Sequence, residues 1–127
     1  MKLYMMIFCL FSVQAFAASC VITDEMRTEF NQKYGGEILV ETKLNDSKYN
    51  VVISAPKNLN GESIVGFYLS AGKLNNPTFF APLDGLEEED FLITWFEVDA
   101  RLIREYSITA EYGWDCGFEV TKKVFSK

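Results

Sequence analysis

The chain has 127 residues, of which 49% are hydrophobic, and its formal net charge at pH 7 is −6. That length suits one domain, and the acidic balance excludes nucleic acid as an expected partner because phosphate backbones would be repelled. The sequence contains no histidine, which excludes Ser–His and Cys–His nucleophile pairs and the histidine-containing zinc and copper ligand sets.

The first segment is organised like an export signal. Lys2 supplies a short positive region, residues 3–13 are an almost unbroken apolar run, and Ala15-Phe16-Ala17 is a small-x-small cleavage pattern. The run is shorter than the ~20 apolar residues of a membrane-spanning helix. We therefore expect residues 1–17 to be removed as a signal peptide. Residues 18–127 would then form the mature domain, without an integral membrane segment, in the periplasm or outside the cell.

Two cysteines, Cys20 and Cys116, remain in the predicted mature chain. In an exported protein they most simply form one disulfide, which the chain-entropy model values at ~4–5 kcal/mol for so long a loop. The alternative is a lipoprotein signal, in which Cys20 would be acylated and would anchor the protein. Ala17 stands where a bulky aliphatic residue is usual, and lipidation would leave Cys116 unpaired. The disulfide is therefore the favoured prediction.

A short amphipathic helix is predicted over about residues 24–33. Thr23 is a favourable N-cap, Phe30 and Tyr34 are one helical turn apart, and Gly35 ends the pattern. Because the apolar stripe is narrow, we expect this helix at the edge of the domain.

Strand patterns follow at the spacing of an all-β domain. The predicted strands cover residues 37–44, 49–55, 63–71, 79–81 and 91–98, followed by a strand-turn-strand unit over residues 102–120. The third strand is apolar on both faces, which is typical of a central strand. Residues 57–62 and 83–90 are predicted loops.

The unit over residues 102–120 has the clearest period of two, with alternate residues apolar except at Arg104. Its turn is predicted between Gly113 and Gly117. The inward phase comprises Tyr106, Ile108, Ala110, Cys116 and Phe118, and the outward phase comprises Ser107, Thr109, Glu111 and Glu119.

These patterns predict a single antiparallel β-sandwich of about seven strands with a short N-terminal helix. The run Tyr106-x-Ile108-x-Ala110-x-Tyr112 resembles a strand of immunoglobulin-type sandwiches. The chain departs from that family because Cys20 precedes the whole sheet, so the Cys…Trp…Cys spacing is missing. A small closed antiparallel barrel would satisfy the same alternation.

The densest charge cluster is an acidic run, comprising Asp84, Glu87, Glu88, Glu89 and Asp90. Such a run can bind Ca²⁺ or dock a basic protein, or it can be a solvated loop that keeps a strand edge from pairing. It lacks the alternating acid spacing of an EF-hand. We therefore predict no metal site and no cofactor, and we keep these residues as a candidate binding surface.

Among the aromatic residues, Trp114 is the candidate for binding. It lies beside the predicted turn at Gly113, where its ring would be partly exposed. The other aromatics fall on alternating phases of predicted strands and are assigned to the core.

The residues support two classes of function. We expect a non-catalytic binding or protein-interaction module, whose partner would be a basic protein. The alternative is a hydrolase that uses carboxylates, with or without Ca²⁺, and needs two acids in one pocket. A subunit of a surface structure is a further possibility, and it would need an open hydrophobic edge strand.

Overall fold

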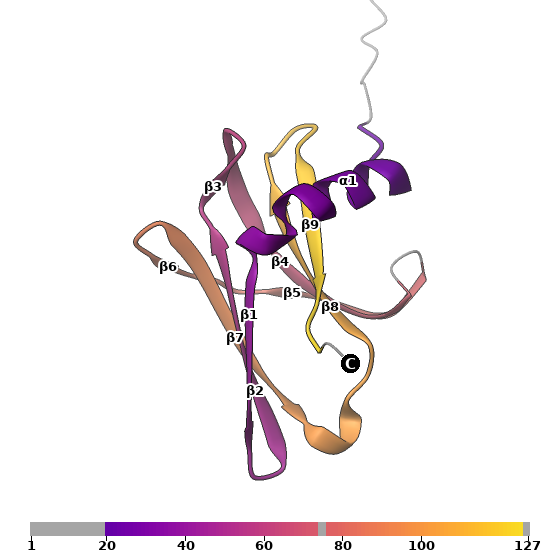
Figure 1. Cartoon of the computed structure of the whole chain (residues 1–127), viewed down its shortest axis with the longest axis vertical. Coiled ribbons are helices and arrows are strands. Elements are labelled where there is room, and N and C mark those ends of the chain that lie inside the picture. Colours follow the sequence, from indigo (N-terminus) through magenta and orange to yellow (C-terminus); the bar gives the residue numbers. More distant parts are fainter. Residues whose placement is uncertain (1–19, 74–75, 126–127) are drawn as a thin grey trace, which may run out of the picture.

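The computed structural model describes residues 20–73 and 76–125. The predicted signal peptide, residues 1–17, lies outside the described residues. Within them, nine strands form two antiparallel sheets packed against each other, with one α-helix at the end of the molecule (Figure 1). The elements in chain order are α1 (Asp24–Tyr34), η1 (Gly35–Glu37), β1 (Leu39–Asn45), β2 (Lys48–Pro56), β3 (Asn58–Leu59), β4 (Glu62–Lys73), β5 (Asn76–Leu83), β6 (Leu86–Glu88), β7 (Phe91–Asp99), η2 (Ala100–Leu102), β8 (Tyr106–Tyr112) and β9 (Phe118–Lys123).

The two sheets remain separate, so the predicted sandwich is confirmed and the closed-barrel alternative is wrong. The first sheet has the order β1-β2-β7-β6, and the second has the order β3-β4-β8-β9 with β5 also paired to β4. The orders β1-β2-β7-β6 and β4-β8-β9 are those of the ABED and CFG sheets of an immunoglobulin constant-type sandwich. The strand β5 lies beyond β4 as an added edge.

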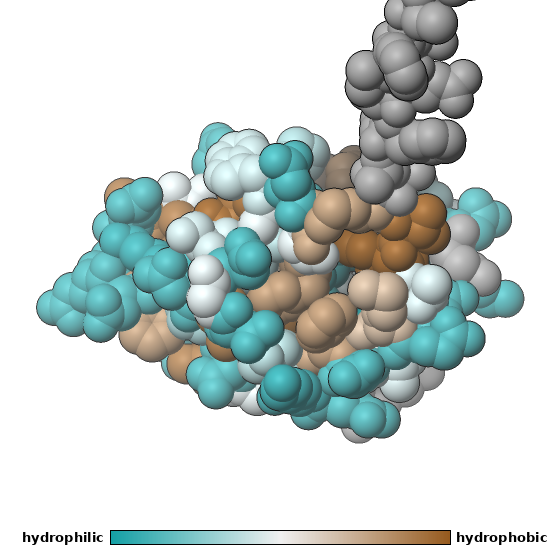
Figure 2. Space-filling view, turned by 90° about the horizontal axis from the view of Figure 1, so that it is seen from above, coloured by the Kyte–Doolittle hydropathy of each residue, from teal (hydrophilic) through white to brown (hydrophobic). Residues whose placement is uncertain are grey.

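The core lies between the sheets and draws on both. Seen from the end that carries α1, hydrophilic residues cover most of the periphery, and hydrophobic residues show in the middle of the molecule (Figure 2). Ile108, Ala110 and Phe118 are buried, as their phase predicts, whereas Tyr106 is only half-buried. The other core residues include Ile38, Val51, Ile53, Ala55, Phe67, Leu69, Tyr112, Val120 and Val124.

Three segments contain more strand than predicted. Asn60 and Gly61 both have positive φ angles, 51° and 79°, and this tight turn lets β3 pair with β4 inside a predicted loop. The strand β5 runs through Pro77 and Pro82, which an edge strand tolerates because its outer side pairs with no other strand among the described residues. The predicted acidic loop contains β6, since its backbone pairs with β7 while its side chains face solvent.

One predicted orientation and one predicted solvent exposure are wrong. Cys116 is exposed, not inward-facing, because the β8–β9 loop leaves the strand alternation there and Cys116 has a positive φ of 53°. Ser107 and Thr109 do lie on the face opposite the core, but they are buried and not solvent-exposed. Thr109 lies on β8 between β4 and β9, and its hydroxyl pairs with that of Thr121 at 2.9 Å. Longer side chains, including Arg27 and Phe80, surround it on this face.

The helix α1 lies at an edge of the sandwich, as predicted, and runs across the strands (Figure 1). The Thr23 hydroxyl caps it by accepting from the Met26 amide at 3.2 Å. On its inner side, Phe30 and Tyr34 stack on Phe118, with ring centroids 5.0 and 5.4 Å apart. None of the described helices is long and hydrophobic enough to span a membrane.

Side chains at this junction complete the backbone hydrogen bonds of the edge. Asn31 Oδ1 accepts from the Thr121 amide of β9 at 2.7 Å. Lys122 Nζ donates to the carbonyl oxygens of Ile38 and Gly35 at 2.8 and 3.3 Å, close to the C-terminal end of α1, where a cation is favourable. The helix therefore covers the β9 edge and prevents it from pairing with another strand.

Candidate functional site

The predicted Cys20–Cys116 disulfide is present and joins the segment before α1 to the β8–β9 loop. The two Cα atoms are 5.1 Å apart, within the range that a disulfide can bridge. The loop passes so close to the end of β8 that a Cβ at Gly117 would clash with the carbonyl oxygen of Tyr112. Only glycine therefore fits at that position.

Trp114 projects from the same loop and is 83% exposed, which is more than the partial exposure predicted. Beside it lies a hollow of about 140 Å³, whose walls include the disulfide, Ile22 and Phe118. An indole this exposed is available for contact, but the hollow is too small to enclose a ligand beside it.

The acidic run forms the β6–β7 hairpin and the connection that precedes it. Thr94 Oγ1 donates to the Asp84 carbonyl oxygen at 2.7 Å, and the Lys57 amide donates to the Asp90 carbonyl oxygen at 2.8 Å. The backbone is thus fixed near both ends of the run. Gly85 passes over Leu92 so closely that an added Cβ would lie 2.6 Å from that side chain.

The carboxylates of this hairpin all face solvent. Glu87 pairs with Lys57 at 3.2 Å. Among the described residues no three acidic or cysteine side chains come together as a group that could hold a metal ion. The hairpin forms the hydrophilic projection on the left of Figure 2. What the run offers is an exposed negative surface, and its role in binding remains a prediction.

The acidic hairpin and Trp114 lie on different sheets. The hairpin is at the edge of the first sheet, on the left of Figure 1, whereas the β8–β9 loop is at the top of the second. The aromatic residues nearest the acids are instead on β7, where Phe91 pairs with Glu88 across the strands. The two binding candidates from the sequence are therefore separate surfaces, and the acidic run adjoins the aromatic residues of β7.

This surface is the outer face of the first sheet, and six of its side chains form what we call the apolar face. The strand register places them in adjacent rows. Leu39, Ser54, Ile93 and Leu86 form one row, and Glu41, Val52 and Trp95 form the next. The apolar face consists of Leu39, Val52, Leu86, Phe91, Ile93 and Trp95.

The apolar face is open to solvent. Leu39, Leu86, Phe91 and Trp95 are 49, 58, 40 and 63% exposed. Directly opposite residues on neighbouring strands lie in side-chain contact range, so the face is continuous. Contiguous exposed apolar side chains rimmed by polar residues are typical of interaction surfaces.

The rim of the apolar face carries charges of both signs, since Lys43 lies in the row beyond Trp95, together with Asn50 and Glu97. Glu41 and Glu88 lie in its rows, and neither has an ion-pair partner among the described residues. Farther along β7, Glu97 pairs with Lys48 at 3.6 Å. The unpaired carboxylates therefore lie next to the exposed aromatic and aliphatic side chains.

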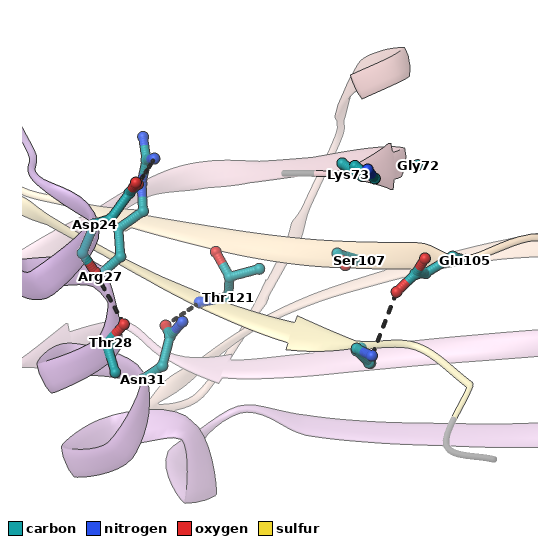
Figure 3. A pocket seen from close by; sticks show the side chains of 10 residues that line it. Asp24, Arg27, Thr28, Asn31, Gly72, Lys73, Glu105, Ser107 and Thr121 are labelled. Carbon is teal, nitrogen blue, oxygen red and sulfur yellow. Dashed lines mark hydrogen bonds and ion pairs between the residues drawn. The ribbon is translucent and has the colours of Figure 1, made fainter. Parts of the chain in front are cut away.

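A second, more polar surface lies on the outer face of the other sheet, and we call it the hydroxyl groove; Figure 3 shows its larger part. Its floor is formed by short hydroxyl side chains of β4, β8 and β9, namely Ser70, Ser107, Thr109 and Thr121. The helix α1 forms one wall through Arg27 and Asn31. Phe80 of β5 lies on the opposite side.

The groove consists of two hollows that share Arg27 and Thr121. The larger has a volume of about 540 Å³ and the smaller about 200 Å³. The larger falls within the ~300–1,000 Å³ typical of small-molecule sites.

Ion pairs line the hydroxyl groove. Arg27 contacts Asp24 at 3.4 Å and Glu119 at 3.5 Å, while Lys123 contacts Glu105 at 3.3 Å. Asp24 and Glu105 lie at opposite ends of the larger hollow (Figure 3), and each faces a cation. This arrangement differs from the facing pair of carboxylates that a glycosidase-like mechanism requires.

In the smaller hollow, burial raises the pKa of Tyr68, and the adjacent Glu119 carboxylate raises it further. The phenol therefore stays protonated throughout the physiological range and can both donate and accept a hydrogen bond. The hydroxyl groove is thus neutral in overall character and rich in hydrogen-bonding groups.

The fold and these surfaces define a small disulfide-linked β-sandwich with an acidic, partly apolar face and a polar groove. In comparisons with protein-family models, curated proteins and solved structures, nothing matches the chain significantly.

The prediction from sequence missed both surfaces, although each left a signal. The strand at residues 91–98 carries Phe91, Ile93 and Trp95 in one phase and apolar residues in the other, which already indicates a strand with two apolar faces. For the hydroxyl groove, the signal is that short hydroxyl side chains recur at the outward positions 107, 109 and 121. These side chains come together only through strand pairing, which the sequence does not reveal.

Proposed function

We propose that this protein is an exported, non-catalytic interaction module that binds a basic protein partner through the apolar face. The observation that carries the proposal is the exposure of Trp95 within a continuous apolar surface next to unpaired carboxylates. Export is supported by the disulfide, which is typical of oxidising compartments, and by the predicted signal peptide.

Each part of this surface has a separate physical role in binding. Trp95 and Phe91 supply large contact areas with few rotatable bonds, which is typical of residues that dominate binding energy. Glu41, Glu88 and the adjoining hairpin supply a negative field, which accelerates encounter with a cationic partner and disfavours acidic ones.

The surface-subunit alternative requires an open hydrophobic edge strand. The outer side of β5 has no paired strand among the described residues, and Phe79 and Phe80 on β5 are exposed. However, Pro77 and Pro82 lack the amide hydrogens that an added strand would need. The edge is therefore less suited to strand addition than the apolar face is to docking.

The proposal is tested with the predicted mature protein, residues 18–127, as bait in quantitative pull-downs. Trp95→Ala removes the central aromatic of the apolar face, and Trp114→Ala is the matched control, an exposed tryptophan on the other sheet. Both substitutions should change the free energy of unfolding by less than ~0.5 kcal/mol. A basic protein captured by the wild type and by Trp114→Ala, but lost with Trp95→Ala, is the expected result.

The rate of association then tests the role of charge. The on-rate for the captured partner should fall as salt rises from about 0.1 M to about 1 M, because the Debye length shortens from ~10 Å to ~3 Å. It should also fall when Glu87, Glu88 and Glu89 are changed to Gln. A partner retained by Trp95→Ala, or an on-rate unaffected by both changes, would contradict the proposal.

A further inference from the structure

We propose that the hydroxyl groove is a second binding site, independent of the apolar face, and that it takes a neutral polyhydroxylated ligand such as a short oligosaccharide. The hydroxyl groove lies on the opposite sheet from the apolar face, so its occupant need not compete with a protein partner. Three properties of the groove carry the inference: its charge balance, its positioned hydrogen-bonding groups and an exposed aromatic ring at one end.

The charges that line the groove cancel. Arg27, Lys73 and Lys123 are balanced by Asp24, Glu105 and Glu119, and five of these six are joined in ion pairs. A charged ligand would therefore gain little net attraction, and an anion would also meet the net charge of −6 on the chain. A neutral ligand suits this lining best if its hydroxyl groups can replace water as hydrogen-bond partners of the polar side chains.

The polar groups of the groove are held in position before any ligand arrives. Asn31 Oδ1 accepts from the Thr121 amide at 2.7 Å, which fixes the orientation of the Asn31 side-chain amide. The Nδ2 group of Asn31 has no hydrogen-bond partner among the described residues, and the side chain lies beside Thr121 in the groove (Figure 3). A fixed donor beside paired carboxylates and hydroxyls can bind the vicinal hydroxyls of a sugar, since each sugar hydroxyl both donates and accepts.

The aromatic end of the groove is formed by Phe80. Its side chain is 58% exposed, and its ring centroid lies 4.7 Å from that of Tyr68, which supports it from below the surface. The face of an aromatic ring is electron-rich, so it attracts the weakly positive C–H groups on one face of a pyranose ring. The short Ser70 side chain pairs with Phe80 across the strands and leaves room beside the ring.

The experiment is a titration of the isotope-labelled mature protein with neutral tetrasaccharides of β-1,4-linked glucose, β-1,4-linked N-acetylglucosamine and α-1,4-linked glucose, followed by NMR. At least one should shift the Thr121 and Ser107 amide signals and the Asn31 side-chain amide signal at concentrations up to about 10 mM, an affinity range typical of weak specific sites. The Trp95 indole signal should not respond, because it belongs to the apolar face.

Paired variants distinguish binding at the hydroxyl groove from nonspecific binding to exposed aromatic side chains. Phe80→Ala should weaken binding at least about tenfold, whereas Phe79→Ala, which removes an exposed ring from the other face of β5, should leave it unchanged. Asn31→Asp keeps the oxygen that accepts from Thr121 and removes the amide donor, so it should weaken binding without unfolding the helix junction. No shift with any tetrasaccharide, equal losses with Phe79→Ala and Phe80→Ala, or binding of a neutral Ser/Thr-rich peptide but of no saccharide would each overturn the proposal.

Discussion

The phenol of Tyr112, on β8, donates a 2.8 Å hydrogen bond to the carbonyl oxygen of Pro56 at the end of β2, and so links the two sheets. Tyr112 is fully buried, and its ring stacks on Phe118 with centroids 5.2 Å apart. Burial raises the pKa of Tyr112, with a further contribution from the carboxylate of Glu37. The phenol therefore stays protonated, and remains a hydrogen-bond donor, throughout the physiological pH range.

Replacing Tyr112 by Phe tests this link. The ring and its stacking are kept while the donor is lost, so the free energy of unfolding should fall by about 0.5–1.5 kcal/mol. Denaturant unfolding followed by fluorescence measures the change. An unchanged midpoint would mean that the hydrogen bond between the sheets adds nothing to stability.

The alternation of β8 predicts a large difference between neighbouring positions. Ile108 is fully buried, so Ile108→Ala should lower the free energy of unfolding by ~2–5 kcal/mol. Glu111 is exposed on the same strand, and Glu111→Gln should change it by less than ~0.5 kcal/mol. Comparable losses at the two positions in urea titrations would contradict the assigned phase.

Asp99 should titrate at unusually low pH. Its carboxylate accepts from the Arg101 side chain at 2.8 and 3.1 Å and from the Arg101 amide at 2.9 Å, which lowers its pKa from 3.8 to about 2. Because the pKa is lower in the folded state, the stabilisation is complete above pH 3.8 and is lost as the pH falls towards 2. NMR titration should show the low value in the wild type and a return towards 3.8 in Arg101→Ala. A pKa that does not respond to Arg101→Ala would contradict this cause.

The disulfide should contribute strongly to stability because it closes a loop between residues 96 positions apart. The chain-entropy model predicts that Cys20→Ser combined with Cys116→Ser lowers the free energy of unfolding by ~4–5 kcal/mol. Thermal unfolding of the oxidised wild type and the double variant measures the loss. Alkylation of the unreduced mature protein should detect no free thiol. Two free thiols would contradict the disulfide, whereas a single free thiol at Cys116 would favour the lipid-anchored alternative, in which the Cys20 sulfur carries the lipid.

Local sequence patterns were sufficient to predict those elements whose structure depends on residues close together in the chain. The helix begins after Thr23 and includes Phe30 and Tyr34, as its spacing predicts, because a cap and an apolar stripe act within one segment. The turn between Gly113 and Gly117 and the strands on both sides were likewise predictable. The extra strands β3 and β6 were not, since short polar segments become strands only when a partner strand is in place.

By itself, the sequence predicted an acidic all-β domain with an edge helix and favoured one disulfide, because period, capping and cysteine count are properties of the chain. It left the choice between a sandwich and a small closed barrel open. Only the tertiary structure decided which side chains share a surface. Strand register placed Trp95 beside Val52 and in one row with Glu41, and left Trp114 on the other sheet. Thr109 is buried on a face that alternation alone assigns to solvent. Alternation specifies the face of a strand on which a residue lies, whereas exposure depends on which elements pack over that face.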